Sequence, residues 1–359
     1  MTLHSSHPTD QPTDAAEIDA RYSRQVLFAP IGAEGQRKLG SGRVAIVGMG
    51  ALGTVLANHM VRAGVGFIRL IDRDFVDRSN LQRQMLYDEE DAASTTPKAI
   101  AAAARLSRVN SQVVIEPHVT DLNALNAEAL LQDVDVILDG TDNFNVRFLL
   151  NDVSQKHGIP WIYGGAVASR GVALTILPGD TPCLRCLFAG APAPGTTDTC
   201  DTAGVIGGII HFVASFQSTE ALKLLVGARE QLNLGMQQWD LWFNQQSAIR
   251  VGGAKKADCP ACAKGQYDYL DAIVDSDTIQ SLCGRNSVQI LPVVPHSQPL
   301  DYWEARLQPL GPVEKNRFLL KFSPTPDVQM VLFPGGRVVV QGTDDVIHAK
   351  SLYSRYIGM

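Results

Sequence analysis

The chain has 359 residues, of which 45% are hydrophobic and 19% are charged, with 31 Lys and Arg against 37 Asp and Glu. This composition predicts one large domain and a smaller one, each with its own core, and the net charge of −6 argues against a broadly basic nucleic-acid-binding face. Residues 1–20 have neither an apolar stretch nor a basic start, so we interpret them as a flexible leader and not as a signal peptide.

No stretch predicts a membrane span, because the most apolar later segment, 203–216, is short and contains His211. A buried helix is the better interpretation of that segment. Six cysteines without a secretory signal indicate a reducing, cytoplasmic location, where paired cysteines bind metal more often than they form disulfides.

Residues 21–39 begin with the motif RYSRQ and continue into a predicted short helix, and the main signal of the chain follows them. The apolar run 44–47 meets a turn with Gly48, Gly50 and Gly53, and a helical pattern comes directly after it. A strand, a glycine turn and a helix in this order form a phosphate-binding unit, because the amides that start the helix favour an anion.

The second predicted strand, 67–71, ends at Asp72, where a carboxylate can bind the ribose of a nicotinamide cofactor or of ATP. Predicted strands and helices then alternate, which indicates an α/β fold with a doubly wound, mostly parallel sheet. The strands are expected at 44–48, 67–71, 112–117 and 134–139, and the helices at 52–63, 97–109, 124–131 and 145–156.

The strand 134–139 runs into the motif DGTDN, which contains Asp142. Ligands bind beyond the carboxyl ends of such strands, so Asp142 is expected to face the same crevice as Gly50 and Asp72. The alternative is that Asp142 is only the N-cap of the next helix.

Beyond this motif the pattern becomes less regular. Strands are expected at 161–163 and 172–177 with Gly164 and Gly165 between them, a mobile loop at 178–208 that carries Cys200, a helix at 205–226, and strands at 236–242 and 247–251. We expect an α+β lobe at 265–359, with a hairpin of strands 331–333 and 337–341 and a last helix at 345–357. The predicted domains are therefore 21–264 and 265–359.

Four cysteines form two Cys-x-x-Cys pairs, Cys183 with Cys186 and Cys259 with Cys262. Each pair offers two thiolates on one tight turn, and two such turns complete a tetrahedral site that suits Zn²⁺. Four protein ligands leave no position for water, so this zinc is expected to be structural; the alternatives are redox dithiols or unpaired buried thiols.

Polar residues that follow the second strand gather near the nucleotide crevice, namely Asn80, Arg83, Gln84 and Lys98. Cations there can hold the β- and γ-phosphates, and Asp142 can hold Mg²⁺, which is typical of nucleotidyl or phosphoryl transfer and not of hydride transfer. Together with the glycine turn they favour ATP over a dinucleotide.

These residues belong to an ordered set of motifs: RYSRQ, GMGALG, LIDRDFVDRSNLQRQ, TTPKA, DGTDN, CLRC, TCDTAGVIG and CPAC. The set resembles the adenylyltransferases that activate sulfur-carrier proteins, the ThiF/MoeB/HesA relatives of ubiquitin-activating enzymes, over residues 20–262. The resemblance implies a Rossmann-like homodimer that binds ATP and Mg²⁺ and adenylylates the Gly-Gly carboxylate of a small ubiquitin-like carrier, with a persulfide as the sulfur donor and no nucleic acid or membrane partner.

By resemblance, Asp72 binds ribose, Asn80, Arg83 and Lys98 bind the phosphates, Asp142 binds the metal and the α-phosphate region, and Arg24 reaches the phosphates of the neighbouring subunit. Asp74 and Gln84 are further candidates for binding the nucleotide. One departure is Ala51, where many relatives have a further glycine after the one that matches Gly50.

Two further cysteines invite a sulfur-handling role. Cys200 lies on the loop that bears such a cysteine in the thiamine-type relatives, and the alternative is that it takes no part, since adenylylation does not require a thiol. Cys283 lacks the Cys-x-x-Gly-x-Arg spacing of a rhodanese, because Asn286 and Val288 occupy the glycine and arginine positions, so we expect an ordinary buried cysteine there.

The longer C-terminal lobe, with FPGGRVVVQGTDD and SLYSRYIG, resembles an extension of thiamine-type members, and with Cys200 it favours a ThiS-like carrier and thiazole synthesis. The alternatives are a MoaD-like carrier in molybdopterin synthesis, an NAD-dependent oxidoreductase, and a non-catalytic scaffold that binds a carrier. The oxidoreductase leaves the phosphate-binding cations and the cysteine pairs unexplained, and the scaffold leaves the whole nucleotide site without a use.

Overall fold

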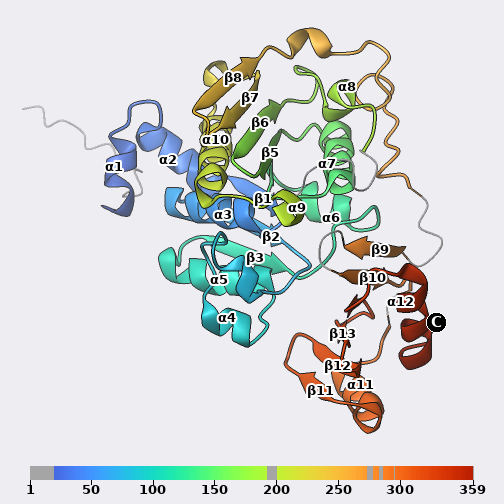
Figure 1. Ribbon diagram of the computed structural model, residues 1–359. Helices are drawn as coiled ribbons and strands as arrows, with labels where there is room; N and C mark the ends of the chain where they lie inside the picture. The colour runs from blue at the N-terminus through green and yellow to red at the C-terminus, as the bar shows by residue number, and fades with distance from the viewer. Residues whose placement is uncertain (1–19, 192–199, 273–277, 283–285, 295, 359) are drawn as a thin grey trace, which may run out of the picture.

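The computed structural model describes residues 20–191, 200–272, 278–282, 286–294 and 296–358, and it contains two β-sheets (Figure 1). The first sheet has eight strands in the order β3-β2-β1-β4-β5-β6-β7-β8. Its strands are β1 (Arg43–Val47), β2 (Phe67–Ile71), β3 (Val114–His118), β4 (Val136–Asp139), β5 (Trp161–Val167), β6 (Arg170–Ile176), β7 (Met236–Asp240) and β8 (Gln245–Ile249).

The first five strands of this sheet are parallel and the other three are antiparallel, so the predicted α/β architecture is confirmed. Its helices are α1 (Ser23–Val26), α2 (Gly32–Ser41), α3 (Ala51–Ala63), α4 (Glu89–Ala93), α5 (Lys98–Val109), α6 (Ala127–Leu131), α7 (Phe144–His157), α8 (Leu184–Leu187), α9 (Cys200–Ala203) and α10 (Gly207–Val226). Short 3₁₀ turns lie at η1 (Ala20–Tyr22), η2 (Arg78–Asn80), η3 (Arg229–Gln231) and η4 (Gly252–Ala254).

The sheet is wound on both faces. Helices α2, α3, α5 and α10 pack on one face around a core that includes Leu39, Leu56 and Ile210, and α6 and α7 pack on the other around Leu131 and Phe148. The five parallel strands therefore end at one common edge, where the expected crevice lies.

Helix α10 is the single helix of the described residues that is long and apolar enough to cross a membrane. It lies against α3 and strands β4, β5 and β6, and it contributes Ile209, Ile210 and Val213 to the core. The predicted helix is therefore confirmed, but only one of its faces is buried, since Ile206 and Phe212 are 37% and 45% exposed.

Two local predictions were wrong. Gly164 and Gly165 do not separate two strands but lie within β5. The reason is a side chain from α10: a Cβ at Gly164 would lie 2.4 Å from the amide of Gln217, whose nitrogen donates to the carbonyls of Asp139 and Ile162. The expected continuous loop 178–208 also contains α8 and α9.

The second sheet has six strands in the order β11-β12-β13-β14-β10-β9 and forms the C-terminal α+β lobe. Its elements are β9 (Thr278–Leu282), β10 (Ser287–Leu291), α11 (Leu300–Leu307), η5 (Gln308–Leu310), β11 (Val313–Lys315), β12 (Leu320–Thr325), β13 (Val328–Leu332), β14 (Val338–Gln341) and α12 (Val346–Tyr356). The predicted hairpin is confirmed, since β13 and β14 pair antiparallel on either side of Gly335 and Gly336. The division at residue 264 stays a prediction.

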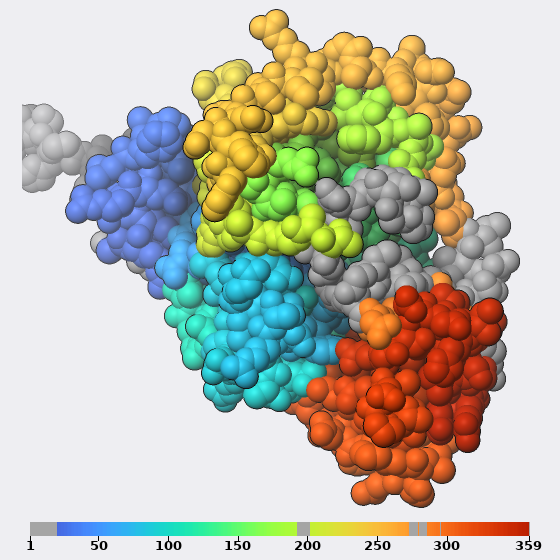
Figure 2. All heavy atoms as spheres, in the orientation of Figure 1, coloured from blue at the N-terminus to red at the C-terminus, as the bar shows by residue number. Residues whose placement is uncertain are grey.

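One face of this second sheet is covered by α11 and α12 around Trp303, Leu307 and Tyr353. On its other face Leu319, Val331 and Phe333 pack with Phe75, which comes from the segment after β2. The space-filling view shows the lobe, in orange and red, against the cyan segment that follows β2 (Figure 2).

Candidate active site

The glycine turn after β1 is built by close backbone contacts. Gly48 has φ +86°, and a Cβ on it would lie 2.8 Å from the backbone of Gly140, which follows β4. A Cβ on Gly53 would lie 1.8 Å from the Gly48 carbonyl oxygen. These two positions therefore require glycine, because the first turn of α3 packs directly on the strand end.

Gly50 differs from these two, because a Cβ there would meet no atom within 4 Å. It is the N-cap residue of α3, and no side chain caps that helix start. The start of α3 thus lacks a side-chain cap and has open space beside Gly50 at the carboxyl edge of the sheet, which is the arrangement that suits a phosphate. Ala51 is accommodated as the first residue of the helix.

Asp72 fixes the glycine turn to the end of β2. Its Oδ2 accepts from the Met49 amide at 2.6 Å and its Oδ1 from the Asp74 amide at 2.6 Å. Burial raises the pKa of Asp72, and the nearby Lys98 ammonium opposes this. Each carboxylate oxygen can accept a second hydrogen bond, so the side chain can still bind ribose hydroxyls.

Lys98 starts α5 and is brought to the same loop. The main chain of residues 74–76 pairs with residues 96–98 through the amides of Lys98 and Val76. The Lys98 side chain is almost fully buried, and its Nζ lies 3.3 Å from Asp74 Oδ2. An ammonium has three donors, so Lys98 can keep Asp74 and still donate to a phosphate.

The other predicted phosphate residues lie on the turn after β2. Asn80 is buried, and its side chain accepts from the Asp77 amide and so closes the capping box of η2. Arg83 donates from Nη1 to the Ser79 carbonyl at 2.9 Å. Gln84 is buried, and its Oε1 has no protein partner. The segment is thus ordered by its own contacts and leaves one buried acceptor unused.

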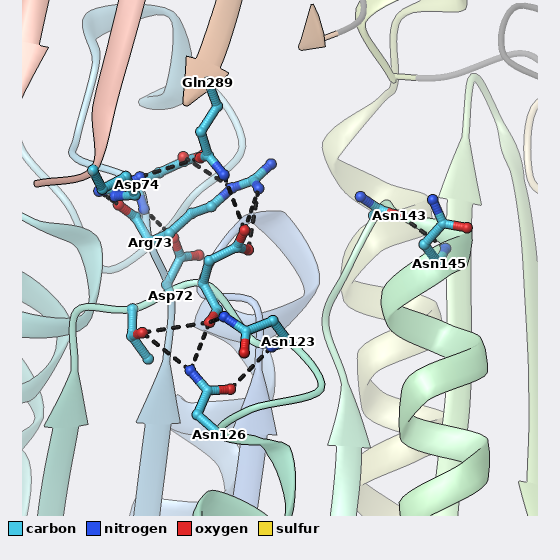
Figure 3. Close-up of polar contacts among 11 residues, drawn as sticks. Asp72, Arg73, Asp74, Asn123, Asn126, Asn143, Asn145 and Gln289 are labelled. Atoms are coloured by element: carbon cyan, nitrogen blue, oxygen red, sulfur yellow. Dashed lines mark hydrogen bonds and ion pairs between the residues drawn. The ribbon is translucent and has the colours of Figure 1, made fainter. Parts of the chain in front are cut away.

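Asp142 is not the N-cap of α7. That position belongs to Asn143, whose Oδ1 accepts from the Asn145 amide at 2.8 Å, and both residues are labelled in Figure 3. The Asp142 side chain is exposed, two residues beyond the Gly140 that packs on Gly48. The capping alternative is therefore excluded, and Asp142 is an exposed residue on the loop whose Gly140 packs on the glycine turn.

Asp139 and Arg147 form a buried ion pair near Asp142, and neither residue was predicted from the sequence. Arg147 Nε lies 3.1 Å from Asp139 Oδ2, and Nη2 donates to the carbonyls of Thr141 and Gly164. Burial raises the pKa of Asp139 although Arg147 opposes it. The signal that could have found the pair is a charged residue on the apolar face of the helical pattern NVRFLLNDV.

Tyr87 is another residue of the site that was not predicted from the sequence. Its hydroxyl is buried and lies 2.7 Å from the Met49 carbonyl oxygen and 3.2 Å from that of Lys98. It thereby joins the glycine turn to the start of α5. Burial raises the pKa of Tyr87, so the hydroxyl stays protonated and donates.

Arg24 is not brought to this site within one chain. It is exposed on α1, and the neighbouring Gln25 side chain donates to the Ala63 carbonyl, at the last residue of α3. The glycine turn lies at the other end of that helix, and Figure 1 shows α1 beside α2, away from α9.

Cys200 begins the short helix α9, which is held at the carboxyl end of β5. The Ala168 amide donates to the Gly204 carbonyl, and the Ile206 amide donates to the Ala168 carbonyl. The helix thus lies at the same edge of the sheet as the glycine turn (Figure 1). Cys283 lies outside the described residues.

The four cysteines of the two pairs meet in one cluster. The Sγ atoms are 3.9 Å apart between Cys183 and Cys186, 3.6 Å between Cys183 and Cys259, and 3.5 Å between Cys186 and Cys262. A zinc–sulfur bond of about 2.3 Å in tetrahedral geometry requires sulfurs about 3.8 Å apart, and a disulfide requires about 2 Å. The spacing therefore fits one Zn²⁺ with four thiolate ligands.

The chain is similar to known proteins over most of its length. The model of the ThiF family matches residues 22–261. The sulfur carrier protein ThiS adenylyltransferase of Bacillus subtilis is 44% identical over 342 residues, covering 95% of this chain and all of that protein. The SAMP-activating enzyme E1 of Haloferax volcanii is 40% identical over 271 residues, covering 75% of this chain and 96% of that protein.

Among solved structures, Escherichia coli MccB with ATP is similar, with a TM-score of 0.60 and 21% identity. The match covers 68% of this chain and 75% of that chain. At this identity the likeness supports the fold alone.

Proposed function

The chain belongs to the ThiF family and is an adenylyltransferase, and we propose that it transfers AMP from ATP to the C-terminal carboxylate of a ThiS-like sulfur-carrier protein. The observation that carries the carrier type is the alignment with the Bacillus subtilis enzyme. Its 342 aligned residues necessarily include most of the C-terminal lobe, whereas the Haloferax enzyme matches only 271 residues.

The proposed reaction needs no covalent enzyme nucleophile. An oxygen of the carrier carboxylate forms a bond to the α-phosphorus of ATP, and the bond from that phosphorus to the oxygen of the β-phosphate breaks. The products are the carrier–AMP mixed anhydride and pyrophosphate. Charge grows on the departing pyrophosphate, so preorganised donors and cations lower the barrier.

In this proposal Asp72 binds the ribose hydroxyls, and the Asp74 amide, which donates to Asp72, supports it. The amides at Gly50 bind the phosphates. Asn80, Arg83, Gln84 and Lys98 contact the phosphate groups. Gln84 can contact a phosphate only through its Nε2 group, because its buried Oε1, which has no protein partner, is an acceptor and needs a donor such as a ribose hydroxyl or a water.

We assign Mg²⁺ to Asp142. The ion prefers oxygen ligands, and this residue is exposed on the loop that packs on the glycine turn, while Asn143 caps the helix. When bound, the ion neutralises charge on the phosphates. Arg147 and Asp139 hold the loop that presents Asp142, since Arg147 contacts the Thr141 carbonyl directly.

We propose a homodimer in which Arg24 serves the site of the partner subunit. The supporting observation is that α1 lies at the end of α3 remote from the glycine turn, and that the turn directly after α1 exposes Leu27 by 73% and Phe28 by 60%. Mixing inactive Arg24→Ala and Asp142→Ala proteins tests this, because subunit exchange would create one intact site per heterodimer. Absence of recovered activity would contradict the shared site.

The zinc cluster is proposed to be structural, because all four ligands are protein thiolates. We also propose a cytoplasmic location, because thiols that bind a metal stay reduced in such a compartment.

Cys200 is proposed to act in sulfur transfer after adenylylation, with a persulfide donor, since α9 lies at the edge where the carrier tail must arrive. Cys200→Ala should keep pyrophosphate exchange and lose thiocarboxylate formation. Loss of both activities would contradict a role confined to sulfur transfer.

The decisive experiment is exchange of labelled pyrophosphate into ATP, with candidate carriers supplied one at a time. Exchange should require a carrier with an intact Gly-Gly end and should be faster with a ThiS-like than with a MoaD-like carrier. A stronger response to the MoaD-like protein would move the proposal to molybdopterin synthesis. Exchange that never depends on a carrier would refute the proposal.

A further inference from the structure

The C-terminal lobe contacts the loop that follows β2, where the proposed ribose residue lies. Two of its residues make this contact with buried polar groups: Gln289 from β10 is 1% exposed, and Arg337, next to β14, is 6% exposed. Their neighbours Val288, Ile290 and Val338 face the opposite core under α11 and α12. Buried polar side chains on this face of the sheet are therefore placed by their contacts with the first domain.

Arg337 binds the main chain between the two acidic residues of the loop. Its Nη2 donates to the Arg73 carbonyl at 2.5 Å, its Nη1 donates to Gln289 Oε1 at 3.4 Å, and its guanidinium carbon lies 3.5 Å from the centre of the Phe333 ring. Burial lowers the pKa of Arg337 to about 10, so the side chain is still a cation at neutral pH.

Gln289 continues the contact to the strand next to β2. Its Nε2 donates to Asp121 Oδ2 at 3.0 Å, and Asp121 lies just beyond β3. Arg73 Nη1 donates to both oxygens of Asp121 at 3.1 Å, and its Nε lies 3.8 Å from Asp74 Oδ1. Figure 3 shows Gln289 above Arg73 and Asp74, on the side away from Asn123 and Asn126.

From Asp74 the contacts reach the glycine turn without a break. The Asp74 amide donates to Asp72, and Asp72 accepts from the Met49 amide. An unbroken series of hydrogen bonds and ion pairs thus joins β10 and β14 to the turn at Gly50. The series balances charge, since Asp72, Asp74 and Asp121 are matched by Arg73, Lys98 and Arg337.

We propose that Gln289 and Arg337 are positioning residues for nucleotide binding, so that the C-terminal lobe completes the ribose side of the ATP site. The inference rests on the proposed function, because it takes Asp72 as the ribose ligand. It goes beyond that function, because the family model ends at residue 261 and both residues lie outside it. Their effect passes through Arg73 and Asp121, and neither residue contacts ATP.

Other contacts of the same lobe provide matched controls. Asn316 Nδ2 donates to the Ser94 carbonyl at 2.9 Å, and Lys321 Nζ donates to Thr95 Oγ1 at 2.8 Å. These contacts reach the turn after α4 and do not touch the loop of Asp72. If the lobe only stabilised the contact between the two domains, the two test residues and the two control residues would affect nucleotide binding equally.

The test measures binding of MgATP by calorimetry and the KM for ATP in pyrophosphate exchange. The test variants of the full chain are Gln289→Leu and Arg337→Met, and the controls are Asn316→Ala and Lys321→Met. Loss of one or two buried hydrogen bonds should weaken ATP binding and raise its KM about tenfold, while kcat changes by less than about twofold. The controls should stay within about twofold of the parent.

Arg337→Lys should recover most of the affinity, because an ammonium can donate to the same carbonyl. If Arg337→Met does not fold, Gln289→Leu decides, since it removes the hydrogen bonds to Asp121 and from Arg337 and nearly keeps the side-chain volume. Folded variants with unchanged ATP affinity, or controls that weaken ATP as much, would overturn the inference. Calorimetry needs no carrier. If the parent protein binds ATP but shows no carrier-dependent exchange, the proposed function is refuted, and the ATP affinities of the test and control variants still decide whether the lobe supports nucleotide binding.

Discussion

Replacing the adjacent residues Asp142 and Asn143 by alanine should separate chemistry from stability. Asn143 caps α7 by accepting from the Asn145 amide at 2.8 Å, whereas the Asp142 side chain is exposed and makes no cap. Loss of an N-cap costs about 1 kcal/mol, which lowers the midpoint of thermal unfolding by about 2 °C in a chain of this size. An exposed residue without such a contact changes stability by less than about 0.5 kcal/mol.

The two variants should therefore show opposite defects. Asp142→Ala should unfold at the same temperature as the parent protein. Its rate of carrier-dependent pyrophosphate exchange should fall by at least about 100-fold, as expected when a charge that stabilises the transition state is removed. Asn143→Ala should unfold earlier and keep most of its exchange rate at 25 °C. The pair is compared by calorimetric unfolding and by exchange at saturating ATP.

The reasoning would be refuted if Asp142→Ala unfolded as early as Asn143→Ala and kept its exchange rate. That result would return Asp142 to a structural role. Equal loss of exchange in both variants would instead show that the loop conformation, and not the carboxylate, is what the reaction needs.

Three further predictions concern the metal, pH and the glycine turn. Cys259→Ser should lower bound zinc from about one ion per chain, by elemental analysis, and lower the unfolding temperature, while the control Cys200→Ser should keep the zinc. Burial raises the pKa of Asp152 to about 6, although the hydrogen bond from the Tyr269 amide acts to lower it. The folded state then binds the extra proton, so this residue's contribution to stability falls as pH rises from about 4 to 6 and stays low above that. Asp152→Asn should remove that fall, roughly 1–3 kcal/mol, from the dependence of unfolding on pH, and an unchanged profile would contradict the assignment. Gly53→Ala should destabilise the fold by about 1–3 kcal/mol through the clash with the Gly48 carbonyl, whereas Gly50→Ala should fold and weaken only ATP binding, as measured by unfolding and calorimetry.

The local pattern of the chain was sufficient for much of the fold. The glycine turn, the alternation of strands and helices and the hairpin at Gly335 and Gly336 each depend on near neighbours in sequence, so their residues reveal them. The cysteine pairs are equally local, and their chemistry alone predicts the tetrahedral cluster that the Sγ distances confirm. The prediction failed at Gly164, where the reason for glycine is the amide of Gln217 on a distant helix.

Tertiary structure alone decided which groups support the site. Arg147 and Asp139 are ordinary members of a helix and a strand until burial makes them a pair near Asp142. Gln289 lies 168 residues after its partner Asp121 and Arg337 lies 264 residues after its partner Arg73, and only the packing of the second sheet on Phe75 brings them together. The sequence by itself determined the chemistry of the nucleotide turn, because that chemistry lies in a short stretch of backbone. What holds this turn in place depends on long-range packing, which no local pattern records.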